Sequence, residues 1–186
     1  MTLIAERGID ATRISDIGRR AGMSAGHVMY YFGTKERLLL ETLRWSEAEL
    51  GDIRAAALRH GRAGWSKLRH FTDIYLPDGV ADPRWILWIE TWRSRAGDIA
   101  APLDELERRW RDDLGHLVGE GIGRGIFRDV DVDDFAVRYI AMLDGLAIEI
   151  VEGVRDRKSV LAIAERGARI ELASGLGGQA TPTRRG

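Results

Sequence analysis

Apolar residues recur at helical spacing along almost the whole chain, and the alternation that marks β-strands is nearly absent. The four prolines, at positions 77, 83, 102 and 182, fall at breaks between these periodic stretches. The pattern therefore predicts an all-α protein of about nine helices. We expect them at residues 2–7, 14–21, 25–31, 35–60, 63–76, 83–99, 103–123, 132–155 and 157–174.

Several helix ends have a chemical reason in the sequence. Ser24, Thr34 and Asp131 stand where a side-chain oxygen can cap the first turn of the helices that we expect from residues 25, 35 and 132. Gly8 and Gly125 stand where helices commonly end, because glycine adopts the left-handed backbone of a C-cap. The final stretch 175–186 is rich in glycine and small polar residues, so we expect a flexible tail.

Residues 14–32 hold two short apolar stripes separated by Gly22, which permits a tight turn. The stripes are Ile14, Ile17 and Ala21, followed by Val28 and Phe32. This layout predicts a helix-turn-helix, in which the second helix enters the major groove of DNA. The alternative is a pair of helices in an ordinary bundle. The small, polar and aromatic residues on the remaining face of the second helix favour the DNA-binding interpretation.

The chain has 28 basic and 29 acidic residues among its 186, which at first argues against nucleic acid. The charge is unevenly spread, however, since residues 1–45 carry seven basic and five acidic side chains. This permits a basic face near the helix-turn-helix, and a solvated charged surface explains the same numbers.

The run from Ile17 to Ser24, continued by Tyr31-Phe-Gly-Thr-Lys-Glu-Arg-Leu-Leu39, strongly resembles the DNA-binding domain of TetR-family transcriptional regulators. The resemblance implies a homodimer that binds palindromic operator DNA and a small-molecule effector, most often as a repressor that the ligand releases. A transcriptional activator of the same fold is the alternative. The family resemblance also implies a DNA-binding domain at 1–45 and a helical ligand-binding and dimerisation domain at 46–174, ahead of the tail.

The same resemblance assigns DNA-contacting roles to particular residues. The segment 24–31 corresponds to the recognition helix, and Lys35 corresponds to a phosphate-binding position at the start of the next helix. Packing in the core is the alternative for Tyr31. The candidates are Thr12, Arg13, Ser15, Ser24, Ala25, Gly26, His27, Met29, Tyr30, Tyr31 and Lys35.

Relatives in the family usually carry about ten to fifteen residues ahead of the position of Thr2. Here only seven residues precede Gly8. We therefore expect a shortened first helix, which would bury less apolar surface and weaken the DNA-binding domain.

Five of the six tryptophans lie between residues 65 and 110. They and their neighbours predict an aromatic pocket for an apolar or cationic ligand, because aromatic ring faces attract cations. Packing in the core is the alternative for each of them. The candidates are Phe71, Tyr75, Trp85, Trp88, Trp92, Trp110 and Leu114. Residues 85–92 and 125–136 resemble the BetI-like subgroup, which implies choline as one option among diverse ligands.

The last two expected helices carry broad apolar faces that need a partner surface. By the family resemblance this is the same pair of helices in a second subunit, forming a four-helix interface. Core packing within one chain is the alternative. The candidates are Phe135, Leu143, Leu146, Ile150, Val154, Leu161 and Ala168.

An enzyme and a ligand-free interaction module are the rival functions. The chain has no cysteine, its four histidines show no metal spacing, and it has no glycine-rich phosphate loop after a strand. We therefore expect no catalytic activity, no metal and no cofactor. The absence of a long apolar run and of a signal peptide predicts a cytoplasmic protein without a membrane partner.

Overall fold

The computed structural model describes residue 3 and residues 11–59 and 64–173. Within these ranges the chain forms eight α-helices and one 3-10 turn, η1, and has no named strand. The all-α prediction is confirmed, whereas the helix expected at 2–7 and the tail lie outside the described residues, apart from residue 3. The elements are α2 (Ile14–Arg20), α3 (Ala25–Phe32), α4 (Lys35–Arg59), α5 (Trp65–Tyr75), α6 (Pro83–Arg93), η1 (Gly97–Ile99), α7 (Ala100–Gly123), α8 (Val132–Val151) and α9 (Arg157–Leu172).

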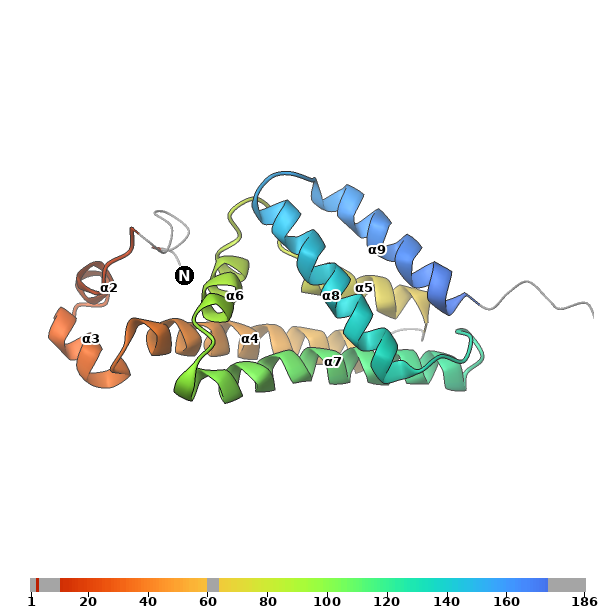
Figure 1. Cartoon of the computed structure of the whole chain (residues 1–186), viewed down its shortest axis with the longest axis horizontal. Coiled ribbons are helices and arrows are strands. Elements are labelled where there is room, and N and C mark those ends of the chain that lie inside the picture. Colours follow the sequence, from red (N-terminus) through yellow and green to blue (C-terminus); the bar gives the residue numbers. More distant parts are fainter. Residues whose placement is uncertain (1–2, 4–10, 60–63, 174–186) are drawn as a thin grey trace, which may run out of the picture.

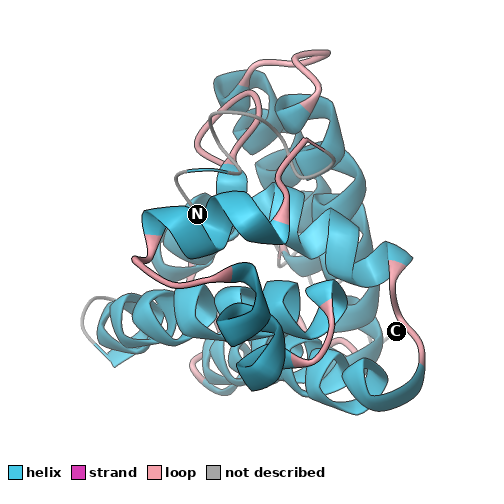
Figure 2. Ribbon diagram, turned by 90° about the vertical axis from the view of Figure 1, so that its left-hand side faces the viewer, coloured by secondary structure: helices cyan, strands magenta, loops and turns pink. Residues whose placement is uncertain are grey.

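The two shortest helices, α2 and α3, lie at one end of an elongated molecule (Figure 1). The long helix α4 runs from this end into the helical body, where it packs against α5, α6 and α7. Helices α8 and α9 form a pair that covers α5, α6 and α7 from the other side. Viewed from the α2–α3 end, the described part consists of helices joined by loops (Figure 2). The expected domain boundary at 45/46 falls inside α4, so one continuous helix belongs to both parts.

The crossing of α2 and α3 depends on two glycines. Gly22 has a φ of 69°, in the left-handed region that glycine adopts without strain, and it makes the turn between the helices. Gly18 is buried, and a Cβ placed on it would lie 2.7 Å from the backbone oxygen of Met23. The close approach of the two helices therefore requires glycine at position 18. Of the first apolar stripe, Ala21 is exposed, while Val28 of the second stripe is fully buried.

The predicted helix caps are present. The Ser24 hydroxyl oxygen accepts from the His27 backbone N–H at 3.1 Å, and Thr34 accepts from the N–H of Arg37 at 3.1 Å. Asp131 accepts from the N–H of Asp134 at 2.9 Å at the start of α8. These bonds satisfy donors that the first turn of a helix leaves unpaired. Gly125, with a φ of 67°, follows the end of α7 as expected.

Two predicted helices are too long at their C-terminal ends. The helix expected at 83–99 ends at Arg93, because Gly97 adopts a φ of 55° and the chain turns through η1 before α7 begins at Ala100. Pro102 lies inside the first turn of α7, where a missing N–H costs nothing. The helix expected at 132–155 ends at Val151, before Gly153, whose φ is 71°.

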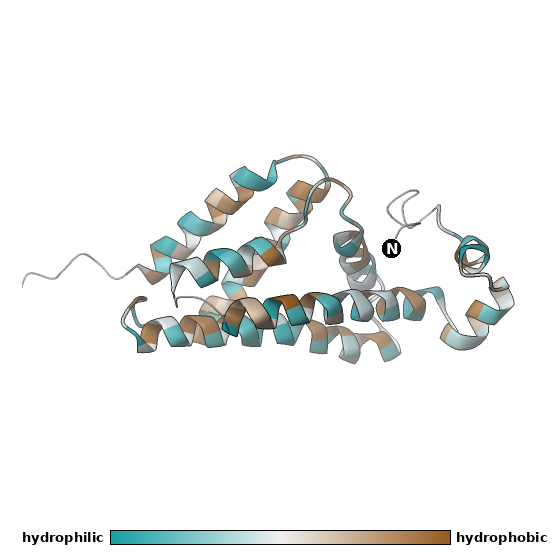
Figure 3. Cartoon of the chain, turned by 180° about the vertical axis from the view of Figure 1, so that it is seen from behind, coloured by the Kyte–Doolittle hydropathy of each residue, from teal (hydrophilic) through white to brown (hydrophobic). Residues whose placement is uncertain are grey.

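A single apolar core lies where α4 to α9 meet. Apolar and polar residues alternate around each helix (Figure 3), and the apolar stripes face this core. Leu43 of α4, Leu114 of α7 and Leu143 of α8 are all fully buried. A stripe that loses its contact with water in this way drives the association of the helices.

We predict that Gly18→Ala disrupts the helix-turn-helix. The added methyl group meets backbone rather than a movable side chain, so we expect a loss of about 1–3 kcal/mol in the stability of this region. Hydrogen exchange of the α2 and α3 amides, together with thermal unfolding, measures the effect. Gly51→Ala is the matched control, since a Cβ on this helical glycine of α4 has nothing within 4 Å. Unchanged exchange rates in α2 and α3 would show that the close approach has no energetic weight.

Candidate functional site

Helix α3 exposes one face of aromatic and small side chains. Tyr30 is 85% exposed and Tyr31 is 69% exposed, while Val28 on the opposite face is 1% exposed and packs inside. Gly26, His27 and Met29 are exposed as well. The exposed residues lie on the outer side of the second helix of a helix-turn-helix, which is the surface that reads a major groove.

The aromatic side chains of this face contact one another. The rings of His27 and Tyr31 stack with centroids 5.1 Å apart, and Tyr30 meets the edge of Tyr31 at 5.6 Å. Tyr31 is held by neighbours on its own helix and remains open to solvent. The alternative that Tyr31 packs in the core is therefore wrong.

The other DNA-contact candidates divide by exposure. Those open to solvent are Arg13, Ser15 and Ser24, and those that are half-buried are Ala25 and Lys35. Thr12 is only 2% exposed, so its assignment to a phosphate contact is wrong in this conformation. Its position just ahead of α2 turns it inward, a fact that helical periodicity does not indicate for a residue outside the helix.

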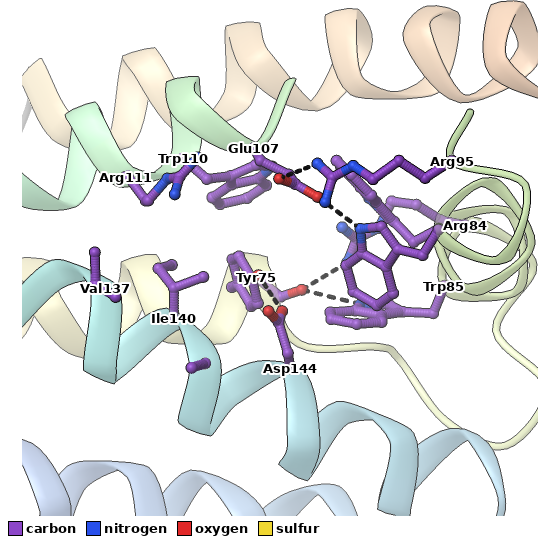
Figure 4. A pocket seen from close by; sticks show the side chains of 13 residues that line it. Tyr75, Arg84, Trp85, Arg95, Glu107, Trp110, Arg111, Val137, Ile140 and Asp144 are labelled. Atoms are coloured by element: carbon purple, nitrogen blue, oxygen red, sulfur yellow. Dashed lines mark hydrogen bonds and ion pairs between the residues drawn. The ribbon is translucent and has the colours of Figure 1, made fainter. Parts of the chain in front are cut away.

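A cavity of about 360 Å³ opens between α5, α6, α7 and α8 (Figure 4). Five predicted aromatic residues line it, together with charged side chains from α6, α7 and α8. Its lining includes Val137 and Ala141, two exposed residues of α8. The lining residues are Tyr75, Arg84, Trp85, Trp88, Trp92, Arg95, Glu107, Trp110, Arg111, Val137, Ile140, Ala141 and Asp144.

The N–H groups of all four lining indoles are bonded within the protein. Trp85 donates to the backbone oxygen of Tyr75 at 3.1 Å, and Trp92 donates to Glu107 at 2.8 Å. Trp88 and Trp110 both donate to Glu47 of α4, at 2.8 Å and 2.9 Å.

These bonds leave the rings with only their carbon surfaces to offer a ligand. The rings also contact one another: Tyr75 lies 5.6 Å from Trp85 and 4.8 Å from Trp110, and Trp88 lies 5.6 Å from Trp92, between centroids. The result is an aromatic wall that suits apolar groups and cations.

Two of the lining arginines are already occupied. Arg84 donates to the backbone oxygen of Tyr75 at 2.8 Å and lies 3.5 Å from the carboxylate of Glu47. Arg95 pairs with Glu107 at 2.6 Å, as seen at the top of Figure 4. These two guanidinium groups therefore bind protein groups in the cavity wall and are not free to bind a ligand.

Asp144 of α8 is the acidic group on the side opposite the indoles. Its carboxylate accepts from the hydroxyl of Tyr75, and Figure 4 shows the two side chains pointing toward each other. The pKa of Asp144 is raised to about 6, mainly by burial and also by the nearby charge of Glu107, while the hydrogen bond from Tyr75 and the charge of Arg111 oppose the shift. Burial and the negative charge of Asp144 raise the pKa of Tyr75 well above its ordinary value, so its hydroxyl keeps its proton. At neutral pH the cavity therefore holds a carboxylate with an unused oxygen.

The sequence identified the aromatic lining and missed the charged lining altogether. Two predicted pocket residues, Phe71 and Leu114, do not line the cavity: they are 1% and 0% exposed and belong to the core behind Trp110. Phe71 and Leu114 therefore pack in the core, as the alternative interpretation of the sequence allowed. No sequence signal separates Arg84 or Asp144 from the charged residues that cover every amphipathic helix.

The predicted dimer residues divide in the same way. Phe135, Leu143, Ile150 and Ala168 are at most 2% exposed within one chain, so their assignment to an interface between subunits is wrong. Leu146 and Leu161 are half-buried, and Val154 is 68% exposed beyond the end of α8. The broad stripe detected in the sequence is the one that faces the core of the same chain. The apolar residues that remain outside on these helices are Val137, Ala141, Ile148, Ala162 and Ile170.

Within the described ranges, no three or more histidine or acidic side chains gather as a metal ion would require. Over the same ranges, every helix is too short or too polar to span a bilayer.

A helix-turn-helix with an exposed recognition helix, joined by one long helix to an aromatic cavity, defines a helical transcriptional regulator. Two family models match the chain: bacterial regulatory proteins of the tetR family over residues 1–42, and the C-terminal domain of BetI-type transcriptional repressors over residues 66–173. The chain belongs to the tetR family and carries a BetI-type C-terminal domain. It is a ligand-responsive DNA-binding repressor and not an enzyme, and the activator alternative is not favoured.

Individual relatives agree with this assignment. The BetI regulator of Rhizobium meliloti (strain 1021) is 30% identical over 154 residues, which are 80% of this chain and 72% of that protein. BetI 2 of Chromohalobacter salexigens is 34% identical over 98 residues, and the match spans about half of each chain, 50% and 47%. A transcriptional regulator from Saccharomonospora viridis, solved in complex with choline, superposes with a TM-score of 0.81 at 27% identity and covers 92% of both chains.

We predict that Asp144→Asn stabilises the protein at neutral pH. A folded-state pKa of about 6, above the ordinary 3.8, means that the folded state binds more protons between these values, so stability falls as pH rises through this window. Asparagine keeps an acceptor for Tyr75 without the charge. We expect a gain of about 1–2 kcal/mol above pH 7, after allowance for partial exposure, which vanishes below pH 4.

Urea unfolding of both proteins between pH 4 and pH 8 measures the difference. Asp52→Asn, an exposed position on α4, is the matched control and should show no such trend. A difference between Asp144→Asn and the wild type that does not change with pH would contradict the assignment.

Proposed function

We propose that the effector of this repressor is a small molecule with a quaternary ammonium group, bound in the aromatic cavity. The observation that carries the proposal is the set of four indoles whose N–H groups are all bonded inside the protein. Their faces attract a cation, and a quaternary ammonium needs no hydrogen-bond acceptor. The Asp144 carboxylate across the cavity adds the opposite charge. The choline complex of the Saccharomonospora viridis relative supports the same class of ligand.

We further propose that DNA is read by the exposed face of α3, by base contacts from His27 and Tyr30 and phosphate contacts from Tyr31 and Lys35. A palindromic operator requires two copies of this helix about one turn of DNA apart, roughly 34–36 Å. The exposed apolar residues of α8 and α9 supply a surface for pairing two chains, with Val137, Ala141 and Ile148 on one helix and Ala162 and Ile170 on the other. A DNA partner places the protein in the cytoplasm.

The link between cavity and DNA runs through α4 in this proposal. Glu47 of α4 is 6% exposed, and its two carboxylate oxygens accept from Trp88 and Trp110. The guanidinium of Arg54, also on α4, lies over the ring of Trp110, 3.9 Å from the ring centroid. A ligand that turns either indole must therefore shift these bonds to α4.

Movement of α4 is felt at the DNA-binding end because only Gly33 and Thr34 separate α4 from α3. A ligand changes the DNA affinity only through its different affinity for two arrangements of the protein. In the proposed mechanism, the occupied cavity favours an α4 position at which the two recognition helices no longer match successive grooves.

The proposal is tested with the intergenic DNA upstream of the gene itself. We expect a gel shift with this DNA that choline reverses in a saturable manner, while a neutral polyol of the same size has no effect. Absence of a shift would refute DNA binding by this chain at that site. A shift that no quaternary ammonium reverses would refute the effector class alone.

We predict that Lys35→Ala weakens DNA binding for all sequences alike. Removal of one phosphate contact should lower the slope of log affinity against log salt by about one. Fluorescence anisotropy at several salt concentrations measures both quantities. Lys158→Ala, an exposed lysine on α9, is the matched control. Wild-type affinity and slope in the Lys35 variant would show that this residue does not bind phosphate.

We predict that Glu47→Gln uncouples the effector from DNA. A glutamine side chain has a single acceptor oxygen, so one of the two indole bonds is lost and an amide N–H faces the other indole. The ratio of DNA dissociation constants with and without choline should fall by about fivefold or more, since allosteric couplings are typically 5–150-fold.

Glu49→Gln makes the same chemical change at an exposed position of α4 and serves as control. Trp88→Phe removes the N–H donor and keeps an aromatic ring, so it should act in the same direction as Glu47→Gln. Wild-type ratios in folded Glu47→Gln and Trp88→Phe proteins would refute the role of Glu47.

A further inference from the structure

The charges that line the cavity are not all neutralised by one another. Arg84 is held by backbone oxygens and Glu47, and Arg95 and Glu107 are paired. Two lining groups remain, Asp144 and Arg111. They influence each other, since Arg111 lowers the pKa of Asp144, but they form no ion pair.

Arg111 faces the cavity from α7, on the same side as Trp110 (Figure 4). It is half-buried at the boundary between this cavity and the outer groove of α7 and α8. Among the described residues, its guanidinium takes part in none of the hydrogen bonds or ion pairs, in contrast to Arg84 and Arg95. A cavity of about 360 Å³ thus contains one negative and one positive group, each with unused hydrogen-bonding capacity.

We propose that the effector is a zwitterion, with a quaternary ammonium at one end and a carboxylate at the other. The ammonium lies against the indoles near Asp144, and the carboxylate accepts from Arg111. This inference rests on the proposed effector role of the cavity and adds the second charge of the ligand.

The electrostatic reason is the effect of each ligand on Arg111. A ligand that carries only a positive charge leaves the half-buried guanidinium of Arg111 without an anionic partner. A ligand carboxylate satisfies that guanidinium, because the arginine presents a fork of two N–H donors that matches the two oxygens of a carboxylate. The aromatic wall disfavours a primary ammonium at the other end, because its three N–H donors would face ring carbons and the unused oxygen of Asp144, while both oxygens of Glu107 are already bonded.

Isothermal titration calorimetry with matched ligands tests the proposal. The probes are choline and a series of trimethylammonium carboxylates with one to four methylene groups between nitrogen and carboxylate. We expect at least one carboxylate to bind about tenfold or more tightly than choline, as a charge-assisted hydrogen bond provides. The carbon isosteres, in which a quaternary carbon replaces nitrogen, should bind much more weakly.

Arg111→Gln should remove the preference for the carboxylates, because their hydrogen-bonding partner is lost. The affinity for choline should stay within about threefold, because choline loses only a nearby like charge. Arg108→Gln is the matched control: this arginine is on the same helix and exposed, and it does not line the cavity. Asp144→Asn should weaken choline and the carboxylates alike.

Three results would overturn the proposal. In the first, choline binds as tightly as every carboxylate, which leaves the effector cavity standing and removes the zwitterion. In the second, Arg111→Gln weakens choline and the carboxylates equally. If neither choline nor any carboxylate binds, the effector role of the cavity fails together with the zwitterion.

Discussion

The carboxylate of Glu47 joins three helices at the centre of the molecule. It extends from α4 and accepts from Trp88 of α6 and Trp110 of α7, with Arg84 nearby. A carboxylate in a buried position is costly unless its oxygens are bonded, and here both are. The aromatic wall of the cavity is therefore oriented by a residue of the helix that also carries the DNA-binding end. The cavity is thus connected to the recognition helix through α4 and the two residues, Gly33 and Thr34, that precede it.

The two sides of the cavity differ in how firmly they are held. On the indole side, each N–H has a partner and the rings contact one another, so this wall is preorganised for a ligand. On the side of α8, Asp144 has one bond from Tyr75, and the lining includes exposed Val137 and Ala141. In the proposed complex, the ligand therefore adds interactions mainly on α7 and α8. The outer face of α8 is also the surface proposed for the second chain, which brings effector and pairing surface together.

Features that depend on residues close in sequence were predictable. The caps at Ser24, Thr34 and Asp131, and the turn at Gly22, involve atoms only a few residues apart, and each is present. Helical periodicity located every described helix, but it extended two of them beyond Arg93 and Val151 and placed the start of α7 at residue 103 instead of Ala100. The requirement for glycine at 18 was not predicted although Met23 is only five residues away, because it depends on the path that the backbone takes through the turn and not on residue type.

From the sequence alone we could predict the helices, the segment proposed to read DNA and the aromatic character of the cavity. These follow from local spacing and from residue types with strong preferences. Only the tertiary structure decided which apolar residues of α8 and α9 are core, and which charged residues are part of the cavity. Leu143 and Ile148 lie on one helix and read alike in the sequence, yet one is fully buried and the other is 37% exposed. Asp144 and Arg111 are likewise ordinary members of amphipathic helices until packing places both in one cavity. The physical reason is that burial and charge pairing are set by which helices pack together, and the period of a single helix does not contain that information.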